Sequence, residues 1–163
     1  MQFPQVLVIG IGNSYRGDDA VGLAVAQRIR QNVDHAIAVR EFNTPDLNLH
    51  ESWTEKDFVI ILDAVASGGR PGTIFRLDAT RNPLPSSMFH RSTHSFGIAE
   101  AIELARLQKK LPATIVVYGI EGANFLPGEG LSQHVSRAVD ILAEMVLHDV
   151  RQVTVQKRSH THA

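Results

Sequence analysis

The sequence predicts an α/β protein in which a mostly parallel sheet carries helices on both faces. Two apolar runs, at residues 6–9 and 59–62, are typical of strands that are buried on both sides. Apolar residues then recur at helical spacing, first over residues 20–29 and again over 98–105 and 135–146. Strands that alternate with helices are the pattern of a parallel sheet, so these observations together indicate the α/β class.

Glycines, prolines and changes in the spacing of apolar residues divide the chain into further elements. The first helix is expected to end near residue 32, with later strands at 36–42, 57–63, 73–77 and 114–120 and helical segments at 47–53 and 95–110. Residues 73–77 alternate as a half-exposed edge strand does. Residues 78–93 contain two prolines and are expected to form a long surface loop. Ser132 is the expected N-cap of a last helix whose apolar stripe ends at Val146.

Length and composition favour one domain over residues 1–150, because 163 residues with 44% hydrophobic content can build one sizeable core. Residues 151–163 lose the apolar pattern and are expected to be a disordered tail. The net charge of -1 gives no reason to expect nucleic acid or a membrane as a partner. The sequence contains no cysteine, which excludes a thiol nucleophile and fits a cytoplasmic protein. We expect it to be a monomer.

The loop after the first strand reads GIGNSYRGDDAVG over residues 10–22. It differs from a dinucleotide-binding fingerprint because Tyr15 stands where the third glycine would be, and two carboxylates at a helix start repel phosphate. No Gly-Lys-Ser/Thr follows, so it is not a P-loop. The loop therefore favours a cation. Asp18 and Asp19 are adjacent, and a helix cap is an equal alternative for Asp18.

Three residues form a candidate metal site: Asp19, Asp63 and His94. If the first strand lies between the second and third, Asp19 and Asp63 follow neighbouring strands about 4.8 Å apart, where α/β sheets bind ligands. A divalent cation would offset the repulsion between the two carboxylates. His94 precedes an amphipathic helix, whose dipole favours the neutral imidazole that a metal needs. These ligands suit zinc, nickel or a similar ion, although a capping or loop hydrogen-bonding role remains an alternative for Asp63 and a capping or surface role for His94.

Several blocks of the sequence resemble the hydrogenase maturation endopeptidases. They are GIGNSYRGDDAVG (10–22), ILDAVASGG (61–69), THSFGIAEAIEL (93–104), YGIEG (118–122) and GLS (130–132), so the resemblance covers about residues 5–148. It implies a three-layer α/β/α fold with a five-stranded sheet in the order 2-1-3-5-4, strand 4 being antiparallel. It also implies that Asp19, Asp63 and His94 are the metal-contacting residues, with Asp18 as an alternative to Asp19.

The resemblance implies a function as well: an endopeptidase that removes the C-terminal extension of a [NiFe] hydrogenase large-subunit precursor after nickel insertion. The metal would be nickel presented by the substrate, so the isolated protein can be free of metal. The sequence has neither a cysteine nor a G-x-S-x-G serine, which disfavours a covalent intermediate and favours water activated by the metal or by a carboxylate. Two alternatives remain: a metal-binding assembly factor that docks on the precursor without cutting it, and a small-molecule or nucleotide-binding module.

Other residues are left with two interpretations or none. Gly68, Gly69 and the loop at 121–130 either shape a substrate groove or form ordinary turns. Glu121 lies near the rim of a predicted loop and receives no role. His160 and His162 either bind metal or are solvated in the tail.

Overall fold

The computed structural model describes residues 3–34, 37–45, 48–89 and 97–160, and it contains one five-stranded sheet. The strands are β1 (Val6–Ile11), β2 (Ile37–Phe42), β3 (Phe58–Val65), β4 (Ile74–Asp78) and β5 (Thr114–Glu121), in the order β2-β1-β3-β5-β4. All neighbouring pairs are parallel except β4 with β5, which is antiparallel. The predicted fold class, strand order and antiparallel edge strand are therefore confirmed.

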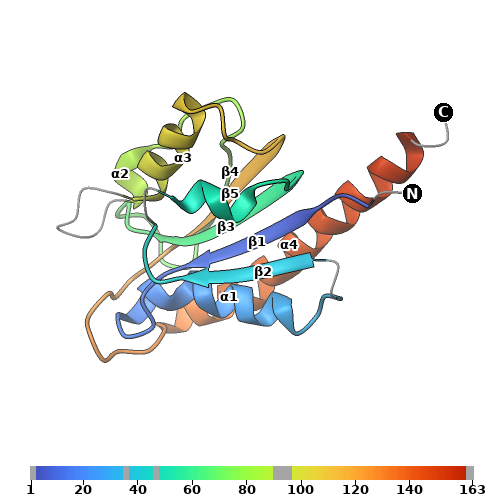
Figure 1. The fold of residues 1–163 in the computed structure, drawn as a ribbon. Coiled ribbons are helices and arrows are strands. Elements are labelled where there is room, and N and C mark those ends of the chain that lie inside the picture. The colour runs from blue at the N-terminus through green and yellow to red at the C-terminus, as the bar shows by residue number, and fades with distance from the viewer. Residues whose placement is uncertain (1–2, 35–36, 46–47, 90–96, 161–163) are drawn as a thin grey trace.

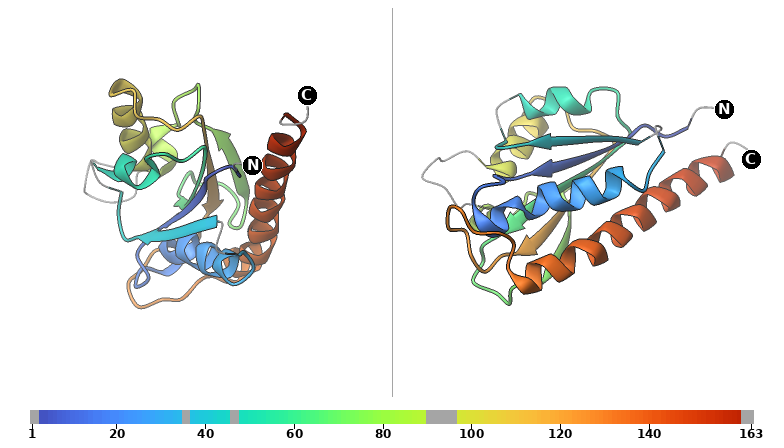
Figure 2. Two further views of the ribbon diagram at one scale, coloured as in Figure 1. Left: turned by 45° about the vertical axis from the view of Figure 1, so that its right-hand side comes forward. Right: turned by 90° about the horizontal axis from the view of Figure 1, so that it is seen from below.

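Helices form a layer on each face of the sheet (Figure 1). The helices α1 (Val21–Arg30) and α4 (Gln133–His160) cover one face, and η2 (Leu49–Trp53), α2 (Ser86–Phe89) and α3 (Ile98–Leu107) cover the other (Figure 2). The side chains of β1 alternate between the two cores, as the period of a strand requires: Val6 and Val8 face α1 and α4, whereas Leu7 and Ile9 face α3.

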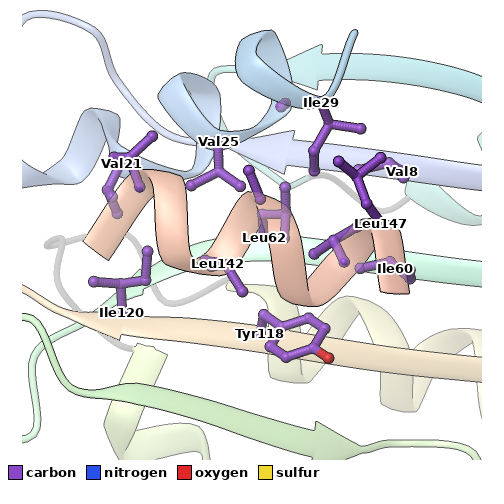
Figure 3. Packing of buried hydrophobic residues seen from close by; sticks show 14 of the residues in the cluster. Val8, Val21, Val25, Ile29, Ile60, Leu62, Tyr118, Ile120, Leu142 and Leu147 are labelled. Carbon is purple, nitrogen blue, oxygen red and sulfur yellow. The ribbon is translucent and has the colours of Figure 1, made fainter. Parts of the chain in front are cut away.

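The core beneath α1 and α4 is the larger of the two buried clusters. Figure 3 shows Val25 and Ile29 of α1 and Leu142 and Leu147 of α4 in this one cluster, together with residues of the strands. Burial of such side chains contributes roughly 1.5–3 kcal/mol each, before the loss of conformational entropy is counted. Within the described residues, no helix is long and apolar enough to cross a membrane.

The strand β3 extends two residues beyond its predicted end at Asp63. Residues 64 and 65 remain in the ladder because β5 continues beside them, with Ala64 opposite Ile120 and Val65 opposite Glu121. The predicted loop at 78–93 contains the short helix α2, and α3 is shorter than the predicted 95–110 within the residues described.

The prediction of a disordered tail is wrong for residues 151–160, because α4 continues to His160. The apolar stripe does not stop at Val146. Val150 is buried and Val153 packs against the same core, at spacings of four and three residues that keep both on one helix face. The Thr154 hydroxyl also donates a hydrogen bond to the Val150 carbonyl oxygen at 3.0 Å. His162 lies outside the described residues.

Candidate functional site

Asp63 lies where β1 and β3 cease to pair. The β1–β3 ladder ends at Gly10 and Leu62, and Asp63 is the next residue of β3, still paired with Gly119 of β5. Its side chain is only 7% exposed. One carboxylate oxygen, Oδ1, accepts a hydrogen bond from the Ala64 N–H at 2.8 Å. Asp63 is therefore a buried carboxylate at the carboxyl-terminal edge of the sheet.

Asp19 lies at the same edge, in the 3-10 helix η1 (Gly17–Ala20) between β1 and α1. Its Oδ2 accepts a hydrogen bond from the Asn13 N–H at 3.0 Å, and its own N–H donates to the Arg16 carbonyl oxygen at 3.0 Å. The main chain of Asp19 also lies directly against Gly12, where a Cβ would overlap the Asp19 carbonyl oxygen. The fold of this loop thus requires glycine at position 12 and fixes the position of Asp19.

The start of α1 lies on the ends of both strands. A Cβ on Gly22 would overlap the carbonyl oxygens of Ile11 and Leu62, so the first turn of α1 touches β1 and β3 together. Asp19 precedes Gly22 by three residues, and Asp63 follows Leu62. The structure places the two acids at one edge of the sheet, as parallel neighbouring strands predict.

His94 lies outside the described residues. The described residues before it reach the same edge, because the Ala66 N–H, just after β3, donates to the Met88 carbonyl oxygen in α2 at 3.0 Å. Among the described residues, no group of three His, Cys, Asp or Glu side chains is placed to hold a metal ion. The trio of Asp19, Asp63 and His94 stays a prediction.

Asp18 is fully buried and holds a distant loop rather than capping its own helix. Its Oδ2 accepts hydrogen bonds from the Ala123 N–H at 2.7 Å, the Asn124 N–H at 2.9 Å and the Ser132 hydroxyl at 2.8 Å. Its Oδ1 accepts from the Ser132 N–H at 2.7 Å. Burial alone would raise the pKa of Asp18, but the N–H groups of Asn124, Ser132 and Ala123 bring the pKa below its ordinary value.

The loop that Asp18 holds, residues 122–132 between β5 and α4, is called the β5–α4 loop. Three further hydrogen bonds join its main chain to the loop after β1: Asp18 N–H to the Asn124 oxygen, Gly17 N–H to the Glu129 oxygen, and Gly128 N–H to the Tyr15 oxygen, at 2.7–3.1 Å. The two loops lie side by side at one end of the sheet (Figure 2). They therefore form one connected unit around Asp19.

Glu121, like Asp18, is a buried acid that accepts hydrogen bonds from a loop distant in sequence, and the sequence did not suggest this role. Its side chain is 1% exposed and accepts hydrogen bonds from the Ser67, Gly68 and Gly69 N–H groups at 3.0–3.2 Å, and from the Ser67 hydroxyl at 2.6 Å. The consecutive N–H groups of the Ser-Gly-Gly run need an acceptor, but nothing in the sequence identifies Glu121, more than 50 positions away, as that acceptor. Glu121 thus fixes the turn that follows β3.

One hollow in the described part of the protein lies away from these acids. Its volume is about 440 Å³, and Trp53, Lys56 and Lys110 are among its lining residues. These residues precede β3 and β5, at the amino-terminal ends of the strands. It therefore does not include Asp19 or Asp63.

Comparison with known proteins identifies relatives with this fold. A sequence model of the hydrogenase maturation protease family matches residues 25–149. The hydrogenase 2 maturation protease of Escherichia coli (strain K12) is 24% identical over 156 residues, which cover 93% of this chain and 94% of that protein.

Two solved structures agree with these sequence matches in fold. The hydrogenase maturating endopeptidase HybD from E. coli superimposes with a TM-score of 0.78 at 23% identity, covering 91% of this chain and 93% of that one. The [NiFe] hydrogenase maturation protease HycI from Thermococcus kodakarensis KOD1 gives 0.72 at 24% identity, covering 91% and 94%. Because the family model matches most of the chain, this protein belongs to the hydrogenase maturation protease family.

Proposed function

We propose that this protein is an endopeptidase that removes the C-terminal extension of a [NiFe] hydrogenase large-subunit precursor after nickel has been inserted. Membership of the maturation protease family supports the reaction class and the precursor as substrate. The observation that carries the proposal is the placement of Asp19 and Asp63 at the carboxyl ends of adjacent parallel strands. That edge is where α/β proteins bind ligands.

The hydrogen bonds at this edge favour Asp19 over Asp18 as the nickel contact. A carboxylate has about four lone-pair positions. Asp18 accepts four hydrogen bonds, and Glu121, another buried acid at this edge, accepts four as well. Both acids are therefore committed to holding loops. Asp19 is partly exposed beside them.

In this proposal Asp19, Asp63 and His94 contact the nickel that the precursor carries and so place the scissile peptide. Carboxylate oxygen and imidazole nitrogen are suitable ligands for nickel. Hydrolysis adds water across the peptide bond: the water oxygen bonds to the carbonyl carbon, the C–N bond breaks, and the amine takes a proton. Either the substrate's nickel or one of the carboxylates activates the water. We also propose that the protein acts in the cytoplasm as a monomer, which sedimentation equilibrium and cell fractionation would test.

The test compares nickel-loaded with nickel-free precursor and follows the precursor's mass. We expect the wild type to cut only the loaded form, and Asp19→Ala, Asp63→Ala and His94→Ala to leave it whole. Asp140→Ala and His160→Ala are matched controls, because both residues are exposed on α4, and the Arg28–Asp140 ion pair at the surface is worth little.

Each outcome separates one hypothesis from another. Equal cutting of the nickel-free form would remove nickel from the recognition step. A precursor that is bound but keeps its mass would favour the alternative of a non-catalytic assembly factor. Full activity in the three variants would show that these residues do not form the site.

A further inference from the structure

Two large apolar side chains stand exposed on the paired loops beside Asp19. Tyr15, in the loop after β1, is 78% exposed, and Leu126, in the β5–α4 loop, is 63% exposed. We propose that Tyr15 and Leu126 form a docking surface that binds an apolar segment of the polypeptide substrate next to the site of cleavage. This inference rests on the proposed function, since it takes the hydrogenase precursor as the occupant.

The main chain at both residues is held in the same way. The Tyr15 N–H donates to the side-chain oxygen of Asn13 at 2.9 Å, and the Leu126 N–H donates to the side-chain oxygen of Asn124 at 2.9 Å. In each case an asparagine two residues earlier closes a turn on the backbone of the apolar residue. Both residues therefore lie in turns that are closed by a hydrogen bond.

The two turns are also bonded to each other. The Gly128 N–H, two residues after Leu126, donates to the Tyr15 carbonyl oxygen at 2.8 Å. The buried Asp18 carboxylate accepts the Asn124 N–H and so holds the start of the Leu126 turn. A surface that is ordered before binding loses little conformational entropy when a partner arrives.

The surface adjoins the proposed nickel contact. Tyr15 is followed by Arg16, whose carbonyl oxygen accepts the Asp19 N–H at 3.0 Å, so the aromatic residue directly precedes the turn that carries the acid. A protease must hold its substrate on either side of the scissile bond, and tyrosine is among the side chains that contribute most at protein interfaces. Tyr15 and Leu126 are in position to bind the chain that presents nickel to Asp19.

The position also favours the substrate over a second copy of this protein as the occupant. A second copy seated on Tyr15 and Leu126 would lie over the next turn of the loop, which carries Asp19, and would compete with the precursor. The surface can therefore serve cleavage only if a segment of the substrate occupies it.

The experiment measures two quantities with nickel-loaded precursor: its dissociation constant, and kcat/KM for cleavage. Tyr15→Ala is expected to lower kcat/KM about tenfold and Tyr15→Ala with Leu126→Ala more than that, through KM rather than kcat. Tyr15→Phe should keep most of the affinity, because the ring supplies the contact area. Leu107→Ala is the matched control, since Leu107 is 81% exposed at the end of α3.

The outcomes distinguish this inference from the proposed function. Unchanged binding and cleavage in the double variant would overturn the docking surface and leave the protease proposal standing. A wild type that binds precursor without cutting it would overturn the protease proposal, while weaker binding by the double variant than by Leu107→Ala would still support the docking surface. Wild-type protein that fails to bind overturns both. Self-association lost in the double variant, with precursor binding intact, would assign the surface to a second copy and overturn the inference.

Discussion

Replacing Asp18 by alanine should destabilise the protein more than replacing its neighbour Asp19. Asp18→Ala removes the acceptor for three main-chain N–H groups and one hydroxyl. An unsatisfied buried donor costs about 1–3 kcal/mol. Because Ala123 is exposed and Asn124 and Ser132 are only partly buried, water can reach part of the gap. We therefore expect a net loss of about 3 kcal/mol in the free energy of unfolding.

Urea unfolding followed by circular dichroism measures this loss, and the melting temperature should fall by about 10 °C for a chain of this size. Asp19→Ala is the matched control. Its Oδ2 accepts a hydrogen bond from the partly buried Asn13, so we expect a loss of about 1 kcal/mol together with loss of cleavage. Equal urea midpoints for Asp18→Ala and wild type would refute the assignment of Asp18 as a structural acid.

The pKa of Asp18 sets the sign of a pH effect. Burial opposes ionisation, but the N–H groups of Asn124, Ser132 and Ala123 lower the pKa below its ordinary value. The folded state therefore binds the proton less well than the unfolded state. The stability that Asp18 contributes is complete above about pH 4 and is lost as the pH falls through the lower folded pKa. Between pH 5 and 3, wild type should lose more stability than Asp18→Asn, whereas parallel losses would contradict the lowered pKa.

Two further predictions concern the other buried polar contacts. Glu121→Gln replaces one acceptor oxygen by an amide donor. The backbone amides of Ser67, Gly68 and Gly69 should then exchange with deuterium faster than in the wild type, while the α1 amides exchange at an unchanged rate. Equal protection of the three amides in variant and wild type would show that Glu121 does not hold this turn. Burial and the hydrogen bond to Asp149 raise the pKa of Tyr118 to about 12, although Arg76 opposes this shift. The protein should therefore lose stability as the pH rises from about 10 to 12. Tyr118→Phe should remove this loss.

The strands could be predicted from sequence because their apolar runs are local signals. The end of β3 could not, since residues 64 and 65 are held in the ladder by β5, which lies about 50 positions later in the sequence. The end of α4 was also missed, because polar residues around Val150 and Val153 dilute the stripe that buries them. The strand order came from the resemblance to a family, and the spacing of the elements did not determine it.

The roles of the acids, like the ends of the elements, could be predicted from sequence only in part. Sequence placed Asp19 and Asp63 at the strand ends but could not separate Asp18 from Asp19, which are adjacent and identical in type. What separates them is a tertiary contact: Asp18 meets N–H groups more than 100 positions away, and Glu121 meets a turn more than 50 positions away. No local pattern encodes such partners.

The hydrogen-bond partners of these acids affect what the carboxyl-terminal edge of the sheet can bind. Asp18 and Glu121 accept hydrogen bonds from N–H and O–H groups, which are dipoles and carry no net positive charge. Together with Asp19 and Asp63 they bring four acidic side chains to one end of the sheet. Two of the four also fix the loops on either side, so these loops need not rearrange when a ligand arrives. We expect an edge lined by carboxylates to bind a cation carried by a substrate more readily than phosphate, in agreement with the proposed metal-bearing polypeptide and against a nucleotide.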